Sequence, residues 1–200
     1  MLRIIIVRPG ATDFDEQGRI KGDLDIPLNE SGNGQISRTA NEITELGIQV
    51  VFSSPCQAAN ETAQLLADRL GVKIKQIDQL ANLNHGLWQG LLIDDVKSRQ
   101  PKVYRQWQEQ PESVCPPEGE MVSNAQTRVN PFLDRVLKKY RNGCVAIVIP
   151  EPLATIVKCR LQDHQLPDLW QVEKECGTWE LLNIQTNPFL ASTNGLNQGL

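Results

Sequence analysis

The sequence is poor in residues that bind metals and in cysteines arranged to pair. Its 200 residues include only two histidines, His85 and His164, which lie far apart. No two of the scattered cysteines form a Cys-x-x-Cys pair; they are Cys56, Cys115, Cys144, Cys159 and Cys176. We therefore expect no metal or other cofactor. An odd number of scattered cysteines indicates a reduced chain in the cytoplasm.

Long apolar runs and a strong excess of one charge are also absent. No apolar segment approaches the length of a membrane-spanning helix. A strand-like run begins where a signal peptide would lie, so we expect none. The formal net charge of -4 argues against nucleic acid or an anionic membrane as the main partner. A hydrophobic content of 40% suits one globular domain over residues 1–200.

The chain alternates between strand-like and helix-like segments. Strands are expected at residues 4–7, 50–53, 72–77, 144–149 and 178–184. Helices are expected at residues 31–46, 58–70, 122–140 and 152–161, with Gly47 and Gly71 ending the first two. This alternation predicts an α/β three-layer sandwich, with a mostly parallel central sheet flanked by helices. The polar tail, residues 186–200, is expected to be loosely held.

The first strand ends in a loop of unusual composition. Residues 4–12 read Ile-Ile-Ile-Val-Arg-Pro-Gly-Ala-Thr, a β-branched run that stops at Arg8. Ligand sites in open α/β sheets lie outside the carboxyl ends of the strands. Arg8 is therefore expected at a site.

These residues carry a family resemblance. Residues 8–12 and the following loop match, in register, a strand ending in Arg-His-Gly-Glu-Thr and a later Gly-Arg-x-x-Gly; the matching residues are Arg8, Gly10, Thr12, Gly18, Arg19 and Gly22. The chain thus resembles the histidine phosphatase superfamily, in its phosphoglycerate mutase branch. The resemblance implies the phosphoglycerate mutase-like fold. It also implies that residues 91–117 form a cap over the site, although an ordinary helix that packs Tyr104 and Trp107 on the domain explains them equally well.

The chemical groups that the resemblance implies are missing. The nucleophilic histidine is Pro9, whose nitrogen belongs to the peptide bond. The second histidine is Pro150, the phosphate-clamping arginine is Ala58, and the general acid is Asn82. Loss of a nucleophile alone can slow an enzyme by a factor of about 10⁶.

Two hypotheses follow. The first is a catalytically inactive relative, a pseudoenzyme with a regulatory, ligand-binding or protein-scaffolding role. Its partner is unidentified, and a homodimer is suggested by analogy alone. The alternative is a phosphatase or other hydrolase with altered chemistry, using His85 or the carboxylates of Asp15 and Glu151 as bases.

A vestigial pocket is predicted from the residues that would still surround the site: Arg8, Gly10, Asp15, Arg19, His85 and Glu151. Asp15 takes the place of a phosphate-contacting asparagine. Glu151 precedes Pro152, expected as the first residue of a helix, so its carboxylate would occupy the positive end where a phosphate would dock. We expect Arg8 to pair with Asp15 or Glu151 and the pocket to bind phosphate poorly. Arg8 is then either a structural ion pair or a retained ligand contact.

Overall fold

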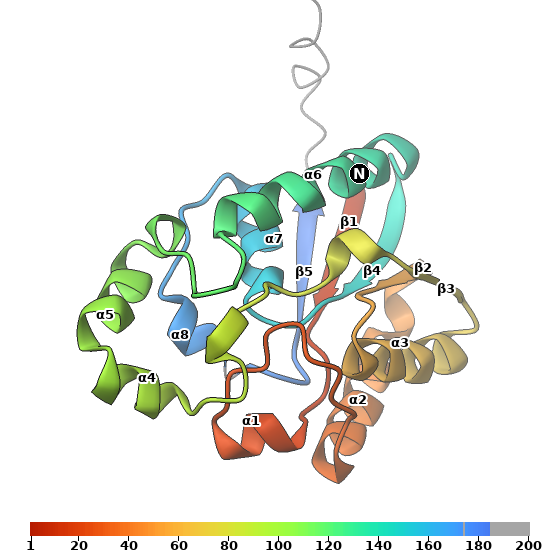
Figure 1. The fold of residues 1–200 in the computed structure, drawn as a ribbon. Helices are drawn as coiled ribbons and strands as arrows, with labels where there is room; N and C mark the ends of the chain where they lie inside the picture. The colour runs from red at the N-terminus through yellow and green to blue at the C-terminus, as the bar shows by residue number, and fades with distance from the viewer. Residues whose placement is uncertain (174, 185–200) are drawn as a thin grey trace, which may run out of the picture.

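The fold is built on one five-stranded sheet, which the computed structural model shows with the order β3-β2-β4-β1-β5 (Figure 1). The structure describes residues 1–173 and 175–184. The strands are β1 (Leu2–Val7), β2 (Ile48–Ser53), β3 (Lys73–Gln76), β4 (Gly143–Val148) and β5 (Trp179–Ile184). Each lies within two residues of its predicted position at either end, which confirms the five predicted strands.

Four of the strands run parallel. β4 lies between β1 and β2 and pairs in parallel with both, while β3 adds a parallel edge to β2. β5 pairs antiparallel with β1, with Val7 opposite Trp179. Almost every residue of β1 and β4 is buried, as expected for central strands covered on both faces. The predicted three-layer sandwich with a mostly parallel sheet is confirmed.

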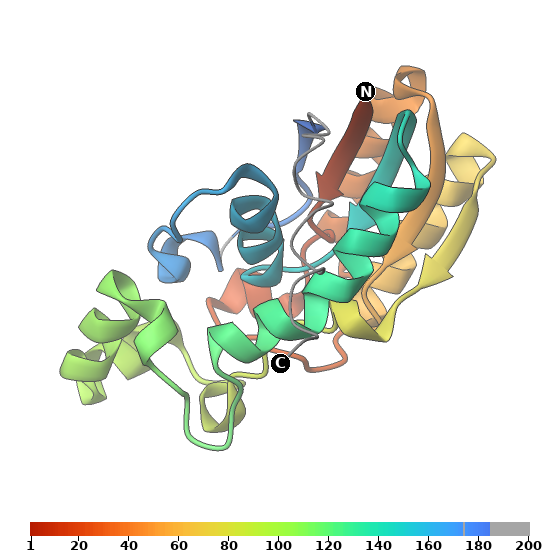
Figure 2. The ribbon, with the colours of Figure 1, turned by 90° about the horizontal axis from the view of Figure 1, so that it is seen from above.

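Two pairs of helices cover the two faces of the sheet (Figures 1 and 2). On one face α2 (Glu30–Ile43) and α3 (Gln57–Leu70) pack on Ile5 and Val7. On the other, α6 (Val122–Lys139) and α7 (Leu153–Gln162) pack on Ile4 and Ile6. Alternate residues of β1 therefore supply two separate cores, which follows from the two-residue period of a strand.

Local signals fix the ends of the helices on the first face. Asn29 caps α2 by accepting from the Gly32 backbone N–H at 2.8 Å. A 3₁₀ turn at Thr44–Leu46 follows α2, and Gly47 then takes a φ of 66°. Gly71 ends α3 at a φ of 65°. These left-handed positions favour glycine, and both were predicted as helix ends.

Residues 91–117 form a helical lobe beside the sheet (Figure 2). They contain α4 (Ile93–Arg99), α5 (Pro101–Glu109) and a 3₁₀ turn at Pro111–Ser113. Trp107 is fully buried against Trp88, with ring centroids 5.7 Å apart, and Tyr104 stacks on Trp170 of α8 (Leu169–Val172) at 5.1 Å. The aromatic side chains of this segment therefore pack into the core.

Some structure escaped sequence prediction. α1 (Asp13–Gln17), α8 and 3₁₀ turns at Asp78–Leu80 and Gly86–Trp88 are too short to show a helical period. The sequence predicts Pro152 as the first residue of a helix, whereas in the structure it lies just before α7. The predicted tail, residues 186–200, lies outside the described residues. In the part of the chain that is described, no helix is long and apolar enough to cross a bilayer.

Candidate functional site

A small cavity lies where the loops after β1 and β4 meet the start of α3. Its volume is about 20 Å³, which is enough for a water molecule. Chemically distinctive side chains of its wall are Thr12, Asp15, Lys21, Cys56, Glu151 and Glu175. The site thus lies at the carboxyl ends of parallel strands, as expected from the first strand and its loop.

The positions that lost their chemical groups converge on this cavity. Pro9, Ala58 and Pro150 come from three separate segments, and all three line it. Asn82 is buried behind them, where its amide donates to the backbone oxygens of Gly22 and Glu151, each at 2.8 Å. The amide oxygen of Asn82 also accepts from the Leu153 backbone N–H at 3.3 Å. Asn82 therefore connects two loops, and its amide cannot act as a general acid.

Arg8 is surrounded by carboxylates of its own chain. Its Nε donates to Glu151 Oε1 at 2.6 Å and lies 3.0 Å from Glu175 Oε2, while Nη2 donates to Glu180 Oε1 at 2.6 Å. Burial alone would lower the pKa of Arg8, but these carboxylates raise it above its ordinary value. Arg8 therefore stays charged. Of the two predicted partners, Glu151 pairs with Arg8 and Asp15 does not.

Glu151 is the buried acid of the cavity wall. Its side chain is fully buried, with Oε1 held by Arg8 and Oε2 accepting from the Thr155 backbone N–H at 3.0 Å. The carboxylate thus occupies the positive end of α7. Burial raises the pKa of Glu151 above its ordinary value, and Arg8 offsets only part of this rise. A buried carboxyl group with a raised pKa beside a water-sized cavity is a candidate general base.

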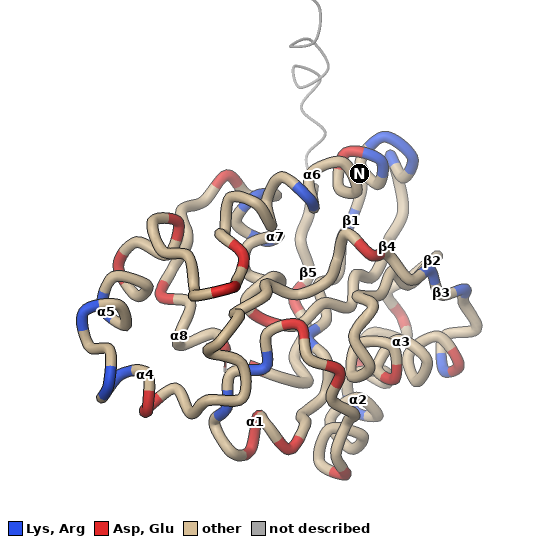
Figure 3. The backbone as a smooth tube through the Cα atoms, viewed as in Figure 1, with Lys and Arg blue, Asp and Glu red and all other residues tan. Residues whose placement is uncertain are grey.

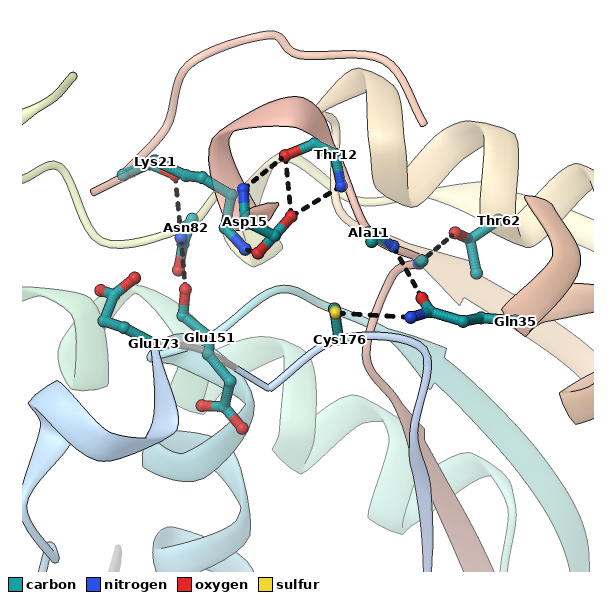
Figure 4. Close-up of polar contacts among 12 residues, drawn as sticks. Ala11, Thr12, Asp15, Lys21, Gln35, Thr62, Asn82, Glu151, Glu173 and Cys176 are labelled. Atoms are coloured by element: carbon teal, nitrogen blue, oxygen red, sulfur yellow. Dashed lines mark hydrogen bonds and ion pairs between the residues drawn. The ribbon is translucent and has the colours of Figure 1, made fainter. Parts of the chain in front are cut away.

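Asp15 and Lys21 form a second ion pair on the opposite side of the site (Figure 4). Asp15 Oδ2 accepts from both the backbone N–H and the hydroxyl of Thr12 at 2.7 Å, which completes a capping box on α1. These contacts hold Asp15 in place. Lys21 lines the cavity with only 12% of its side chain exposed. Sequence reasoning missed Lys21, although its place in the Gly-Arg-x-x-Gly loop was a usable signal.

Three predicted pocket residues do not line the cavity: Arg8 lies behind its wall in contact with Glu151 and Glu175, and Arg19 and His85 make their contacts elsewhere. Arg19 donates to the Gln17 side chain at 2.7 Å and to the Gly90 backbone oxygen at 2.6 Å, and it does not line the cavity. His85 is fully buried among Trp88 and Trp107, with its Nε2 2.7 Å from Glu173 Oε1. Both residues are therefore structural contacts, because neither side chain reaches the cavity.

Gly10 and Cys56 complete the wall. A Cβ on Gly10 would lie 2.5 Å from the backbone oxygen of Gly32, so only glycine lets the loop approach α2 so closely. Cys56 precedes α3, and burial raises the pKa of its thiol. The thiol is therefore protonated near neutral pH, which argues against a thiolate nucleophile.

Acidic and basic residues are interspersed over most of the described chain (Figure 3). The cavity departs from this mixture, because the carboxylates of Asp15, Glu151 and Glu175 line it against the single ammonium of Lys21. The lining residues therefore carry more negative than positive charge, and Arg8 behind them offsets part of the excess through its contacts with Glu151 and Glu175.

Comparisons with known proteins agree on one family. The family model described as the histidine phosphatase superfamily (branch 1) matches residues 4–193. Phosphoserine phosphatase 1 of Hydrogenobacter thermophilus is 27% identical over 185 residues, which cover 92% of this chain and 88% of that protein.

Two further matches show the range of relatives. A bifunctional protein of Mycobacterium tuberculosis is 33% identical over 73% of this chain, which spans only 40% of that protein's length. Among solved structures, a mycobacterial glucosyl-3-phosphoglycerate phosphatase matches with a TM-score of 0.80 at 22% identity, over 90% of each chain. This last likeness shows that the fold is shared.

The relatives correct the main functional hypothesis. A pseudoenzyme with a regulatory role was predicted from Pro9, Ala58, Asn82 and Pro150, and this prediction is wrong because the relatives are named phosphatases. The alternative, a phosphatase or other hydrolase with altered chemistry, agrees better with them. The physical reason is that four missing groups remove one mechanism only, whereas Glu151 and Lys21 provide the cavity with other chemical groups.

Proposed function

The chain belongs to the histidine phosphatase superfamily, and we propose that it hydrolyses phosphate monoesters by a route that needs no histidine. One observation carries the proposal: Glu151, whose buried carboxyl group pairs with Arg8, lines a water-sized cavity whose wall also holds the cation Lys21. The phosphatase names of the relatives support the same class of reaction.

In the proposed reaction a water molecule replaces the histidine nucleophile. The water oxygen attacks phosphorus while Glu151 accepts a proton from the water. The bond between phosphorus and the ester oxygen breaks, the leaving alkoxide takes up a proton from solvent, and Glu151 returns its proton to solvent, so that phosphate and alcohol are the products. Lys21 supplies positive charge to the phosphoryl oxygens, in the role that an arginine at position 58 would otherwise fill.

The charge balance of the cavity favours a second candidate substrate. Three carboxylates line the wall, those of Asp15, Glu151 and Glu175, against the single ammonium of Lys21. Arg8 offsets part of this negative charge through Glu151 and Glu175, and the rest disfavours a phosphate monoester, which carries close to two negative charges at neutral pH. The second candidate substrate is therefore an ester with less negative charge, such as a phosphodiester, hydrolysed with Glu151 as the general base.

The proposal is tested by assaying para-nitrophenyl phosphate, bis-para-nitrophenyl phosphate and para-nitrophenyl acetate side by side. Glu151→Gln is expected to lower the rate on the accepted ester about 10²–10⁴-fold, because it removes the general base. The matched control is Glu173→Gln, a buried glutamate that does not line the cavity, and it is expected to keep the activity. Full activity in Glu151→Gln would rule out the proposed base.

The pH profile gives a second readout on Glu151. A general base works only when it is ionised, so the rate falls as the pH drops through its pKa. Because burial raises the pKa of Glu151, this fall is expected above pH 4.5, the ordinary value of a glutamate. Glu151→Gln is expected to abolish this acid limb. If stopping the reaction with acid trapped a covalently phosphorylated enzyme, direct attack by water would be contradicted.

We also propose a reducing, cytoplasmic setting for this reaction. All five cysteines are free in the structure, and unpaired cysteines are typical of such compartments. Fractionation of the source cells with an antibody against the protein tests this placement.

A further inference from the structure

We propose that Glu175 competes with the substrate for Arg8 and thereby limits which anions the cavity admits. This inference rests on the proposed function, because it concerns the binding step of the same site. It starts from the crowding of Arg8, whose side chain is only 3% exposed and contacts three carboxylates of its own chain.

The three carboxylates differ in how firmly they are held. Glu151 is fully buried and also accepts from the Thr155 backbone N–H at 3.0 Å. Glu180 lies on β5 and also pairs with Lys158. Glu175 is 46% exposed, and among the described residues its carboxylate has an ion pair with Arg8 alone. Glu175 is therefore the carboxylate that an incoming anion can displace.

The contact of Glu175 with Arg8 also lies at the cavity wall. Of the two partners of Arg8 Nε, Glu175 Oε2 is the more distant, at 3.0 Å against 2.6 Å for Glu151. Glu175 lines the cavity together with Lys21, whereas Glu180 does not. An oxyanion that takes the place of the Glu175 carboxylate would therefore contact Arg8 at a cavity whose wall also holds Lys21.

The backbone around Glu175 is held independently of its side chain. The backbone N–H of Gly177 donates to the Pro9 oxygen at 2.7 Å, and that of Arg8 donates to the Thr178 oxygen at 2.8 Å. Cys176 accepts from the Gln35 side chain at 3.8 Å (Figure 4). A change of the Glu175 side chain therefore leaves the anchoring of this segment intact.

Competition follows from the charges. Phosphate and the carboxylate of Glu175 are both anions that would occupy the same place beside Glu151 at the Nε of Arg8, so one must displace the other. Removal of the negative charge at position 175 is therefore expected to favour anion binding. The ligand class is a tetrahedral oxyanion, with inorganic phosphate and orthovanadate as probes.

The test is calorimetric titration of the full chain with inorganic phosphate and with orthovanadate. Glu175→Gln is expected to bind both about tenfold more tightly than the wild type, because one repulsive charge is lost. Glu180→Gln is the matched control, because it also removes a carboxylate from Arg8 but does not line the cavity; we expect a change below about threefold. Glu45→Gln, on an exposed turn near the amino end of β1, controls for net charge.

Each result decides the inference. Unchanged affinity in Glu175→Gln, or an equal gain in Glu180→Gln or Glu45→Gln, would overturn it. Glu175→Ala repeats the measurement with a shorter side chain, and circular dichroism checks that both variants fold. If Glu175→Gln binds phosphate more tightly but no form of the protein hydrolyses an ester, the proposed function is wrong and this inference holds. If the wild type hydrolyses an ester but Glu175→Gln binds phosphate as the wild type does, the proposed function holds and this inference is wrong.

Discussion

Glu151 and Glu173 are both buried glutamates, and their neighbours give them different roles. Glu151 lines the cavity, and its carboxylate is held by Arg8 and the start of α7. Glu173 faces His85, at 2.7 Å, within a cluster of tryptophans. Within the described residues, His85 Nδ1 and Glu173 Oε2 have no hydrogen-bond partner. The His85–Glu173 contact is therefore a structural pair, whose value depends on both members being present.

This dependence predicts a non-additive effect on stability. His85→Phe is expected to lower the free energy of unfolding by about 1–3 kcal/mol, because it leaves the buried Glu173 without a partner. The double variant His85→Phe/Glu173→Leu is expected to recover most of this loss, since both polar groups are replaced by apolar ones. Urea denaturation of the two single variants and the double variant measures the coupling. Additive losses would contradict the pairing.

Among the helices, α6 contains an internal proline. Pro131 lies in the middle of Val122–Lys139 and is exposed, so it removes one backbone hydrogen bond of the helix and packs against little. The apolar face of α6, with Val129, Phe132 and Leu133, holds the helix on the sheet all the same. Burial of that face therefore overrides the local preference of the chain.

Replacement of this proline is expected to stabilise the protein. Pro131→Ala is expected to raise the free energy of unfolding by about 3 kcal/mol through its higher helix propensity. It is expected to lower the same quantity by about 1 kcal/mol, because the unfolded chain becomes more flexible without the proline. The net gain of about 2 kcal/mol corresponds to a rise of about 4–8 °C in the midpoint of thermal unfolding. Asp134→Ala, an exposed position in the same helix, is the control and is expected to change little. A lower midpoint for Pro131→Ala would show that the helix is adapted to its proline.

For the whole molecule, the question is whether a single residue can restore histidine chemistry. Pro9→His would place an imidazole at the cavity, but Ala58, Asn82 and Pro150 would still provide no clamp, acid or second histidine. We therefore expect less than about a twofold gain in phosphatase activity, because groups that act as a unit fail together. Acid-labile phosphohistidine on Pro9→His, measured with radiolabelled substrate, would contradict this expectation.

The sequence by itself determined the fold and the position of the site at the ends of the parallel strands. The β-branched runs of β1 and β4 and the glycines after α2 and α3 act through neighbouring residues, so they could be recognised in one dimension. The same holds for the replacement of the family's chemical groups at positions 9, 58, 82 and 150. The meaning of those replacements for activity did not follow, because a missing group says nothing about which other groups surround the cavity.

Only the tertiary structure decided which side chains share the site. It placed Lys21 and Glu175 at the cavity and removed Arg19 and His85 from it. It also chose Glu151 over Asp15 as the partner of Arg8. Residues 8, 151 and 175 are far apart in the chain, and their contacts depend on how β1, β4 and the segment before β5 meet. A sequence pattern records the neighbours along the chain, whereas charge pairing depends on distances in space.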